Sequence, residues 1–278
     1  MRTLRFQQID VFTSKPLMGN PLALVHDAQD LTDEDMARLA RWTNLSETAF
    51  LLPATHPDAD YRVRIWTPRR ELPFAGHPTL GSCHGWLSQS IEPKAADFIT
   101  QECAIGLVKI RRDGTRLAFA APPLLKSGPV DTSTLEAIAK ALNISLSQII
   151  DHQIVDNGPG WMALLLDSAD SVLKIKPDLS ALAPYKVGVA GPYPPGHDVQ
   201  FEVRALGADA GGGEDPVTGS LNAGIASWFL KTGIAPGSYA VSQGTALGRQ
   251  GRLYVQQVNG QIWVGGQSLT TIEGTLHL

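Results

Sequence analysis

The sequence has 278 residues, of which 43% are hydrophobic and 18% charged, and its formal net charge is −4. These proportions are typical of a folded globular chain of one large domain or two ordinary ones, and the net charge argues against nucleic acid or an anionic membrane as the main partner. No apolar run approaches the ~18 residues of a membrane span, and the N-terminus lacks the apolar core of a signal peptide, so we expect a cytoplasmic protein.

The first predicted helix covers residues 31–42. Thr32 stands at its N-cap with Asp35 at the capping-box position, and Met36, Leu39 and Ala40 lie on one face. An apolar strand is predicted before this helix, at residues 21–28.

A second strand is predicted after the helix, because Tyr61, Val63 and Ile65 alternate with polar residues. The motif His77-Pro78-Thr79-Leu80-Gly81-Ser82 follows, and an apolar helical pattern comes after it. Proline is favoured as the first residue of a helix, which predicts that His77 is the N-cap of a buried helix.

The middle of the chain carries the predicted hinge, in the Pro- and Gly-containing segment 121–133. A helix is predicted directly after it, at residues 132–143, with Ser133 as N-cap and Glu136 in the capping-box position. Leu135, Ile138, Ala139 and Leu142 are expected to face inward.

The second half repeats the first at an offset of about 138 residues. Val199, Phe201 and Val203 alternate as Tyr61, Val63 and Ile65 do, and Asp215-Pro216-Val217-Thr218-Gly219-Ser220 repeats the X-Pro-x-x-Gly-Ser pattern. Hairpin turns are predicted at Asp113-Gly114 and at Asn259-Gly260. The sequence therefore predicts an α+β fold of two pseudo-symmetric halves, residues 1–127 and 128–278, with terminal strands free to cross between them.

The segment 211–220, GGGEDPVTGS, is not a phosphate-binding P-loop, because Gly219 precedes Ser220 where that motif needs a lysine. We expect instead that two helices start at the paired motifs, with His77 and Asp215 as their N-caps, and that their N-terminal amides face a bay for an anionic group. Asp215 is also a common capping residue, so the residues alone leave its role open between a cap and catalysis.

Other candidate sites are weaker. His77 and His84 are two helical turns apart but lack further ligands at a suitable spacing for a metal. Cys83 and Cys103 form no metal or redox motif, and two free thiols are expected. Glu47, between the first helix and an apolar strand, could be a solvated loop carboxylate or a functional one.

The assembled motifs resemble those of the phenazine-biosynthesis PhzF family of isomerases. The resemblance covers nearly the whole chain and rests on several segments: FQQIDVFTSKPLMGNPLALV, NLSETAF, FAGHPTLG, GGGEDPVTGS and SQGTALGRQGRLYV. It implies the diaminopimelate epimerase fold, in which each half is a mixed sheet wrapped round a central helix and the active site lies in the inter-domain cleft. It also implies a homodimer.

By the same resemblance, Glu47 takes a proton from a substrate carbon and later returns one. His77, Asp215 and Ser220 complete the expected catalytic set, and the expected substrate-binding residues are Ser46, Gly76, Thr218 and Gly219. The expected enzyme is an isomerase that uses no cofactor and no metal, acting on a small metabolite that bears a carboxylate. Two alternatives stay open: a non-catalytic small-molecule-binding protein on the same scaffold, and a related lyase or cyclase.

Overall fold

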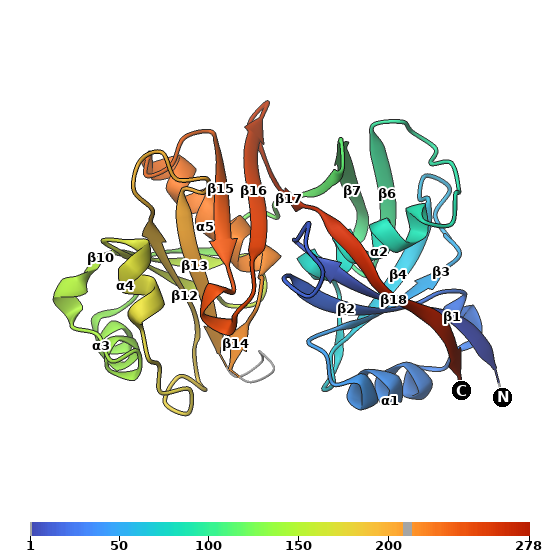
Figure 1. Ribbon diagram of the computed structural model, residues 1–278, viewed down its shortest axis with the longest axis horizontal. Helices are drawn as coiled ribbons and strands as arrows, with labels where there is room; N and C mark the ends of the chain where they lie inside the picture. Colours follow the sequence, from blue (N-terminus) through green and yellow to red (C-terminus); the bar gives the residue numbers. More distant parts are fainter. Residues whose placement is uncertain (1, 208–212) are drawn as a thin grey trace. The chain divides into compact units, whose positions relative to one another are not determined.

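The computed structural model describes residues 2–207 and 213–278, and the chain divides into two compact units (Figure 1). The first unit comprises the residues up to Ala120 together with Gly265–Leu278, and the second comprises Ala121–Val264. The chain thus enters the second unit a few residues before the predicted boundary at residue 127, and its last strand belongs to the first unit.

The first unit is a mixed sheet with two helices. Its strands are β1 (Thr3–Val11), β2 (Asn20–Val25), β3 (Thr48–Leu52), β4 (Tyr61–Trp66), β5 (Glu71–Leu72), β6 (Phe98–Cys103), β7 (Gly106–Asp113), β8 (Arg116–Ala120) and β18 (Ser268–His277). Its helices are α1 (Asp33–Thr43) and α2 (Gly76–Leu87), with a short 3-10 turn, η1 (Ala28–Asp30).

The second unit contains a mixed sheet of the same kind. Its strands are β9 (Lys126–Gly128), β10 (Ile149–Asp156), β11 (Met162–Leu166), β12 (Lys186–Pro192), β13 (Phe201–Gly207), β14 (Glu214–Asp215), β15 (Ser238–Gln243) and β16 (Gly251–Val258); β17 (Gln261–Gly266) includes the return to the first unit. Its helices are α3 (Thr132–Ala141), α4 (Ala169–Lys174) and α5 (Gly219–Thr232), with 3-10 turns η2 (Leu146–Gln148) and η3 (Thr245–Leu247).

The strand pairings of the two units follow one scheme. In the first, β1–β2 is antiparallel, β2–β3 parallel, β3–β4 antiparallel, β4–β6 parallel and β6–β7 antiparallel. In the second, β10–β11, β11–β12, β12–β13, β13–β15 and β15–β16 repeat these orientations in the same order. Short strands β5 and β14 pair with β4 and β13, each just before the long apolar helix of its unit. The predicted α+β duplication is confirmed.

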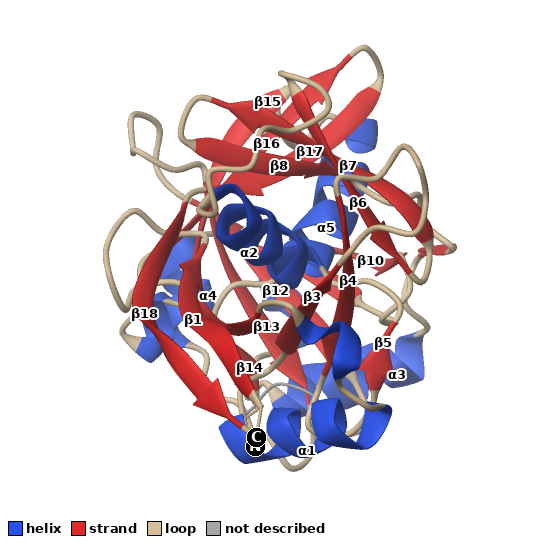
Figure 2. Cartoon of the chain, turned by 90° about the vertical axis from the view of Figure 1, so that its right-hand side faces the viewer, coloured by secondary structure: helices blue, strands red, loops and turns tan. Residues whose placement is uncertain are grey.

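The helix α2 is central to the first unit and contacts the strands around it (Figure 2). Leu22 and Leu24 of β2 face this helix at Gly81 and Gly85, and a Cβ atom at Gly85 would lie 2.1 Å from Leu24 Cδ2. The alternate residue Val25 points to the other face, where it packs with Phe50 and with residues of α1. Both faces of the sheet are therefore covered, which explains why β3 is buried along its whole length.

The second unit is built in the same way around α5, whose buried residues include Leu221, Ile225, Trp228 and Phe229. A separate apolar cluster lies among α3, α4 and strands β11, β12 and β13, and Ile138 and Leu142 are fully buried in it. The inward face predicted for residues 132–143 is thus correct, and Leu135 packs against the same cluster.

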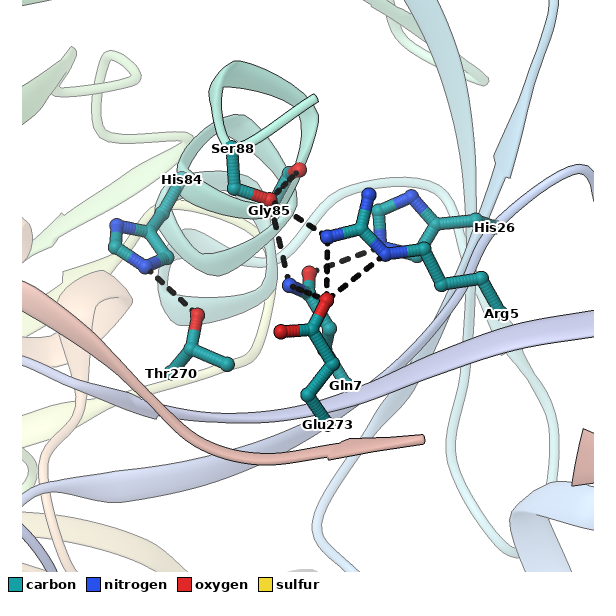
Figure 3. A network of polar contacts seen from close by, with 8 residues as sticks. All are labelled: Arg5, Gln7, His26, His84, Gly85, Ser88, Thr270 and Glu273. Atoms are coloured by element: carbon teal, nitrogen blue, oxygen red, sulfur yellow. Dashed lines mark hydrogen bonds and ion pairs between the residues drawn. The ribbon is translucent and has the colours of Figure 1, made fainter. Parts of the chain in front are cut away.

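A polar network ties the end of α2 to β1, β2 and β18 in the first unit (Figure 3). Gln7 is buried; its Oε1 accepts from His26 Nε2 at 2.9 Å, and its Nε2 donates to Ser88 Oγ at 3.3 Å. Arg5 forms an ion pair with Glu273 at 2.6 Å, and this contact connects the last strand, β18, to the network. Burial lowers the pKa of His26 to about 4, so this ring is neutral at pH 7.

Of the predicted starts of α1 and α3, the first is confirmed and the second is wrong. The capping box of Thr32 and Asp35 in α1 is confirmed. For α3 the prediction of Ser133 is wrong: the N-cap is Asp131, whose side chain accepts from the Thr134 amide at 2.9 Å. Ser133 instead donates its hydroxyl to Asp131 Oδ1.

None of the helices in the described part of the chain has the length and apolar character that a membrane crossing requires.

Candidate active site

In the first unit, the structure brings Glu47 and His77 together. Glu47 directly precedes β3, where the chain bends after α1, and His77 is the second residue of α2. Glu47 Oε2 lies 3.4 Å from His77 Nε2, and the two side chains are 16% and 6% exposed respectively. A largely buried carboxylate is thus paired with an almost fully buried imidazole.

The His77 ring is neutral, because burial lowers its pKa to about 3. Asn20 Nδ2, at the start of β2, lies 3.5 Å from His77 Nδ1. With this amide as donor, Nδ1 is the acceptor and the ring proton sits on Nε2, the nitrogen that faces Glu47. The 3.4 Å approach of Nε2 to Glu47 Oε2 is a close contact between a neutral ring and the carboxylate, and not a hydrogen bond.

Ser46 and Gly76 flank this pair. Ser46 lies half-buried in the bend before Glu47, and Gly76 is the buried first residue of α2. The N-cap of α2 is Ala75, which offers no side-chain capping bond. No N-cap side chain accepts from the amides in the first turn of this helix. An anionic group could therefore accept hydrogen bonds from them.

In the second unit, Asp215 and Thr218 are joined by a short hydrogen bond. Thr218 Oγ1 donates to Asp215 Oδ2 at 2.5 Å and accepts from Gln243 Nε2 at 2.9 Å. Gln243 Nε2 also donates to the Asp215 carbonyl, and Gln243 Oε1 accepts from the Thr218 amide and from Asn222 Nδ2. The buried Gln243 thus uses its whole hydrogen-bonding capacity to fix the segment that carries Asp215.

Ser220 lies in the first turn of α5, directly after Gly219, the first helical residue. Its Oγ accepts from the indole Nε1 of Trp161 at 3.0 Å, and its carbonyl accepts from Asn157 Nδ2 at 2.9 Å. Ser220 is half-buried. Its hydroxyl is therefore held by a neutral donor, and within residues 2–207 and 213–278 no hydrogen bond joins it to a basic side chain.

The sequence pattern of the phenazine biosynthesis-like (PhzC-PhzF) family matches residues 9–274. The chain belongs to this family. It is 37% identical to antisense-enhancing sequence 1 of Schizosaccharomyces pombe, over 97% of both chains. It is 30% identical to trans-2,3-dihydro-3-hydroxyanthranilate isomerase of Pseudomonas aeruginosa, over 99% of both chains.

The fold of the PhzF family is also found by structural comparison. The crystal structure of a PhzF-family protein from Bacillus anthracis matches with a TM-score of 0.85, at 22% identity and over 100% of both chains. The expected fold class is thereby confirmed. Relatives named as isomerases confirm the expected enzyme class as well, so this chain is an isomerase of the PhzF family.

The two expected N-cap positions at the PhzF motifs are wrong. Helix α2 begins at Gly76, so His77 lies within its first turn, and Pro78 is accepted there because first-turn amides need no helical partner. Asp215 lies before α5, whose N-cap is Thr218. Its backbone pairs with Ala205 as part of β14, which keeps it extended and delays the helix start.

Several residues around these motifs were not predicted as functional from the sequence. Gln243 stands within the segment SQGTALGRQGRLYV, where only its place in the family motif marks it. Trp161 and Asn157 lie 59 and 63 residues before Ser220, and no local pattern indicates the contact. Gly211 and Gly212 of the motif 211–220 lie outside the described residues.

Both cysteines are free and buried, as expected, and burial raises the pKa of the Cys83 thiol well above its ordinary value. Cys83 is therefore unsuited to proton transfer near pH 7. Among the residues that the structure describes, no group of three or more His, Cys, Asp or Glu side chains is arranged to hold a metal ion.

Proposed function

We propose that this PhzF-family isomerase moves a carbon-bound proton on a small carboxylate-bearing metabolite without a cofactor, with Glu47 as the general acid and base. The observation that carries the proposal is the pair of Glu47 and His77, 3.4 Å apart and both largely buried. A general base that lifts a proton from carbon needs a site with little water, and burial of this pair supplies one.

The neutral state of His77 supports this assignment. An imidazolium beside Glu47 would stabilise the carboxylate and lower its affinity for a proton, whereas the buried neutral ring does so far less. In the proposed reaction, Glu47 accepts the proton while the electron pair of the C–H bond delocalises into the substrate. Glu47 then returns the proton to another carbon, so no other reactant is required.

The substrate class is proposed from the relatives. One is named trans-2,3-dihydro-3-hydroxyanthranilate isomerase, and we take cyclic amino carboxylates as the first compounds to test. Polar groups of the substrate are proposed to be held by the amides of Gly76 and Gly219, at the starts of the central helices, and by the side chains of Ser46 and Ser220. Asp215 is proposed to place the substrate while Glu47 moves the proton. Thr218 is proposed to act through Asp215, because its hydroxyl already donates there.

Proton NMR in D₂O tests the proposal with trans-2,3-dihydro-3-hydroxyanthranilate and a panel of cyclic and α-amino carboxylates, with no cofactor added. We expect wild type to catalyse isomerisation or deuterium incorporation, and Glu47→Gln to lower kcat by roughly 10²–10⁴-fold, the usual contribution of a general base, while affinity is kept. Glu34→Gln, an exposed glutamate on α1 in the same unit, is the matched control and should behave as wild type.

The outcomes separate the alternatives. Equal exchange by wild type and Glu47→Gln would show that Glu47 is not the base. Binding of a compound without exchange by either protein would favour the non-catalytic binding function. Release of a leaving group in place of a shifted proton would favour the lyase or cyclase.

A further inference from the structure

The side chain of Trp161 makes a contact with Ser220 that the proposed reaction can use. Trp161 is 7% exposed, and its indole Nε1 lies 3.0 Å from Ser220 Oγ. The residue follows the loop between β10 and β11, whereas Ser220 lies in the first turn of α5. The loop therefore places the Trp161 side chain against the first turn of α5.

The shape of this loop is fixed by its own hydrogen bonds. Asp156 Oδ1 accepts from the amides of Gly158 and Gly160, both at 2.7 Å. Both glycines have positive φ values, 131° and 89°, which other residues rarely adopt. The Trp161 carbonyl accepts from the Val155 amide at 2.9 Å, which closes the base of the loop.

The backbone of α5 passes close to the backbone at the end of β10, beside this loop. A Cβ atom at Gly224 would lie 2.5 Å from the Val155 carbonyl oxygen, so only glycine allows α5 to pass the end of β10 at this distance. Ser220 is four residues earlier and thus on the same face of the helix. Asn157 secures the same point, because it donates to the Ser220 carbonyl at 2.9 Å.

The chemistry of the two groups determines the direction of the bond. An indole nitrogen can only donate, whereas a hydroxyl has one donor and two lone pairs. The Trp161 N–H therefore occupies a lone pair of Ser220 Oγ, and the hydroxyl proton is directed elsewhere. A serine held in this way is a hydrogen-bond donor with reduced nucleophilicity.

We propose that Trp161 is a positioning residue, which turns the Ser220 hydroxyl so that it donates to the substrate. This inference rests on the proposed function, in which Ser220 contacts the substrate. Trp161 does not itself touch the reacting atoms in this scheme. Its effect on the rate must therefore pass through Ser220.

A double-mutant cycle in the NMR assay with trans-2,3-dihydro-3-hydroxyanthranilate tests this dependence. We expect Trp161→Phe, which keeps a ring and removes the N–H, to lower kcat by about 10-fold with KM changed less than about 2-fold, the scale of one hydrogen bond. The double variant Trp161→Phe/Ser220→Ala should have the kcat of Ser220→Ala alone. Trp228→Phe is the matched control, since Trp228 is buried in α5 against Phe229, and it should keep the wild-type kcat.

A second measurement observes the contact without a substrate. In ¹⁵N-indole spectra, the resonance absent from Trp161→Phe should shift in Ser220→Ala and exchange faster with water, while the other indole signals change little. An unchanged Trp161 signal would overturn the inference, as would equal losses of kcat from Trp161→Phe in the wild-type and Ser220→Ala backgrounds. If wild type exchanges no compound of the panel, the proposed function fails, and the indole signal still decides whether Trp161 holds Ser220.

Discussion

At the scale of single residues, the fixed parts of the candidate site are held by buried amides. Gln243 is fully buried, and its two N–H groups and its carbonyl oxygen bond to Asp215, Thr218 and Asn222. Because the amide donates to Thr218 Oγ1, the Thr218 hydroxyl must donate onward, and Asp215 receives it. One glutamine thus sets the direction of two consecutive hydrogen bonds.

We expect Gln243→Glu to lower the free energy of unfolding by about 3 kcal/mol. The glutamate keeps the shape and the acceptors but loses both donors, and it places a charge in a buried position near Asp215. Urea unfolding at pH 7 measures the change. Gln257→Glu, an exposed site on β16, is the control and should differ from wild type by less than about 0.5 kcal/mol. An equally stable Gln243→Glu would show that the direction of the amide does not matter.

Some residues of the candidate site can be identified from the sequence, and others cannot. Glu47 and His77 were marked by motifs, and their proximity agrees with the proposed roles. Gln243 and Trp161 were missed because their partners are 25 and 59 residues away, and only the folded sheet brings them together. A hydrogen bond between residues far apart in the sequence produces no motif of fixed spacing by which it could be predicted.

At the scale of elements, the regular patterns were predictable, and so was the start of α1, but the starts of α2, α3 and α5 were not. The alternation at Tyr61, Val63 and Ile65 gave β4, since side chains on strands alternate between faces. Three successive residues, Asp131, Thr132 and Ser133, can all cap a helix, and local preference could not choose Asp131. The start of α5 depends on pairing of β14 with β13, which is a tertiary effect.

The packing of α2 on β2 leads to a prediction at this scale. We expect Gly85→Ala to lower the free energy of unfolding by about 1–3 kcal/mol, because the new Cβ would lie 2.1 Å from Leu24 Cδ2 and force core side chains to move. Gly274→Ala is the matched control in the same unit. A Cβ there has no atom within 4 Å, so the change should stay within about 0.5 kcal/mol. Thermal and urea unfolding of both variants provide the test, and similar stabilities would contradict the close approach of α2 and β2.

At the scale of the whole molecule, the duplication explains why the two halves of the sequence carry related motifs in different settings. Both units have the same order of parallel and antiparallel strand pairs, and a long buried helix at the same place in that order. The apolar runs repeat at a nearly constant offset because each copy must cover the same kind of helix. The polar residues differ: His77 lies within the first turn of α2, whereas Asp215 lies outside α5. A duplicated scaffold can therefore supply two chemically different groups.

Stability of the whole chain should fall between pH 8 and pH 5 because of two buried histidines. The pKa of His26 is lowered to about 4 and that of His77 to about 3, both mainly by burial. A base whose folded pKa is depressed binds its proton more readily when unfolded, so its stabilising contribution is complete above pH 6.5 and declines as the pH falls toward the folded pKa. At pH 5 each of the two rings should lower the free energy of unfolding by about 2 kcal/mol relative to its value at pH 8.

His26 allows the effect to be isolated, because it lies in the network with Gln7 and away from Glu47 in sequence and contacts. We expect His26→Gln, which can still donate to Gln7, to reduce the loss of unfolding free energy between pH 8 and pH 5 by about 2 kcal/mol. Urea unfolding at both pH values measures this difference even if the variant is less stable overall, since only the change with pH is compared. His56→Gln, an exposed histidine of the same unit, should leave the pH dependence as in wild type. If His26→Gln retained the full wild-type dependence, the His26 ring would not be a neutral buried group, and the loss would have to come from other titrating side chains.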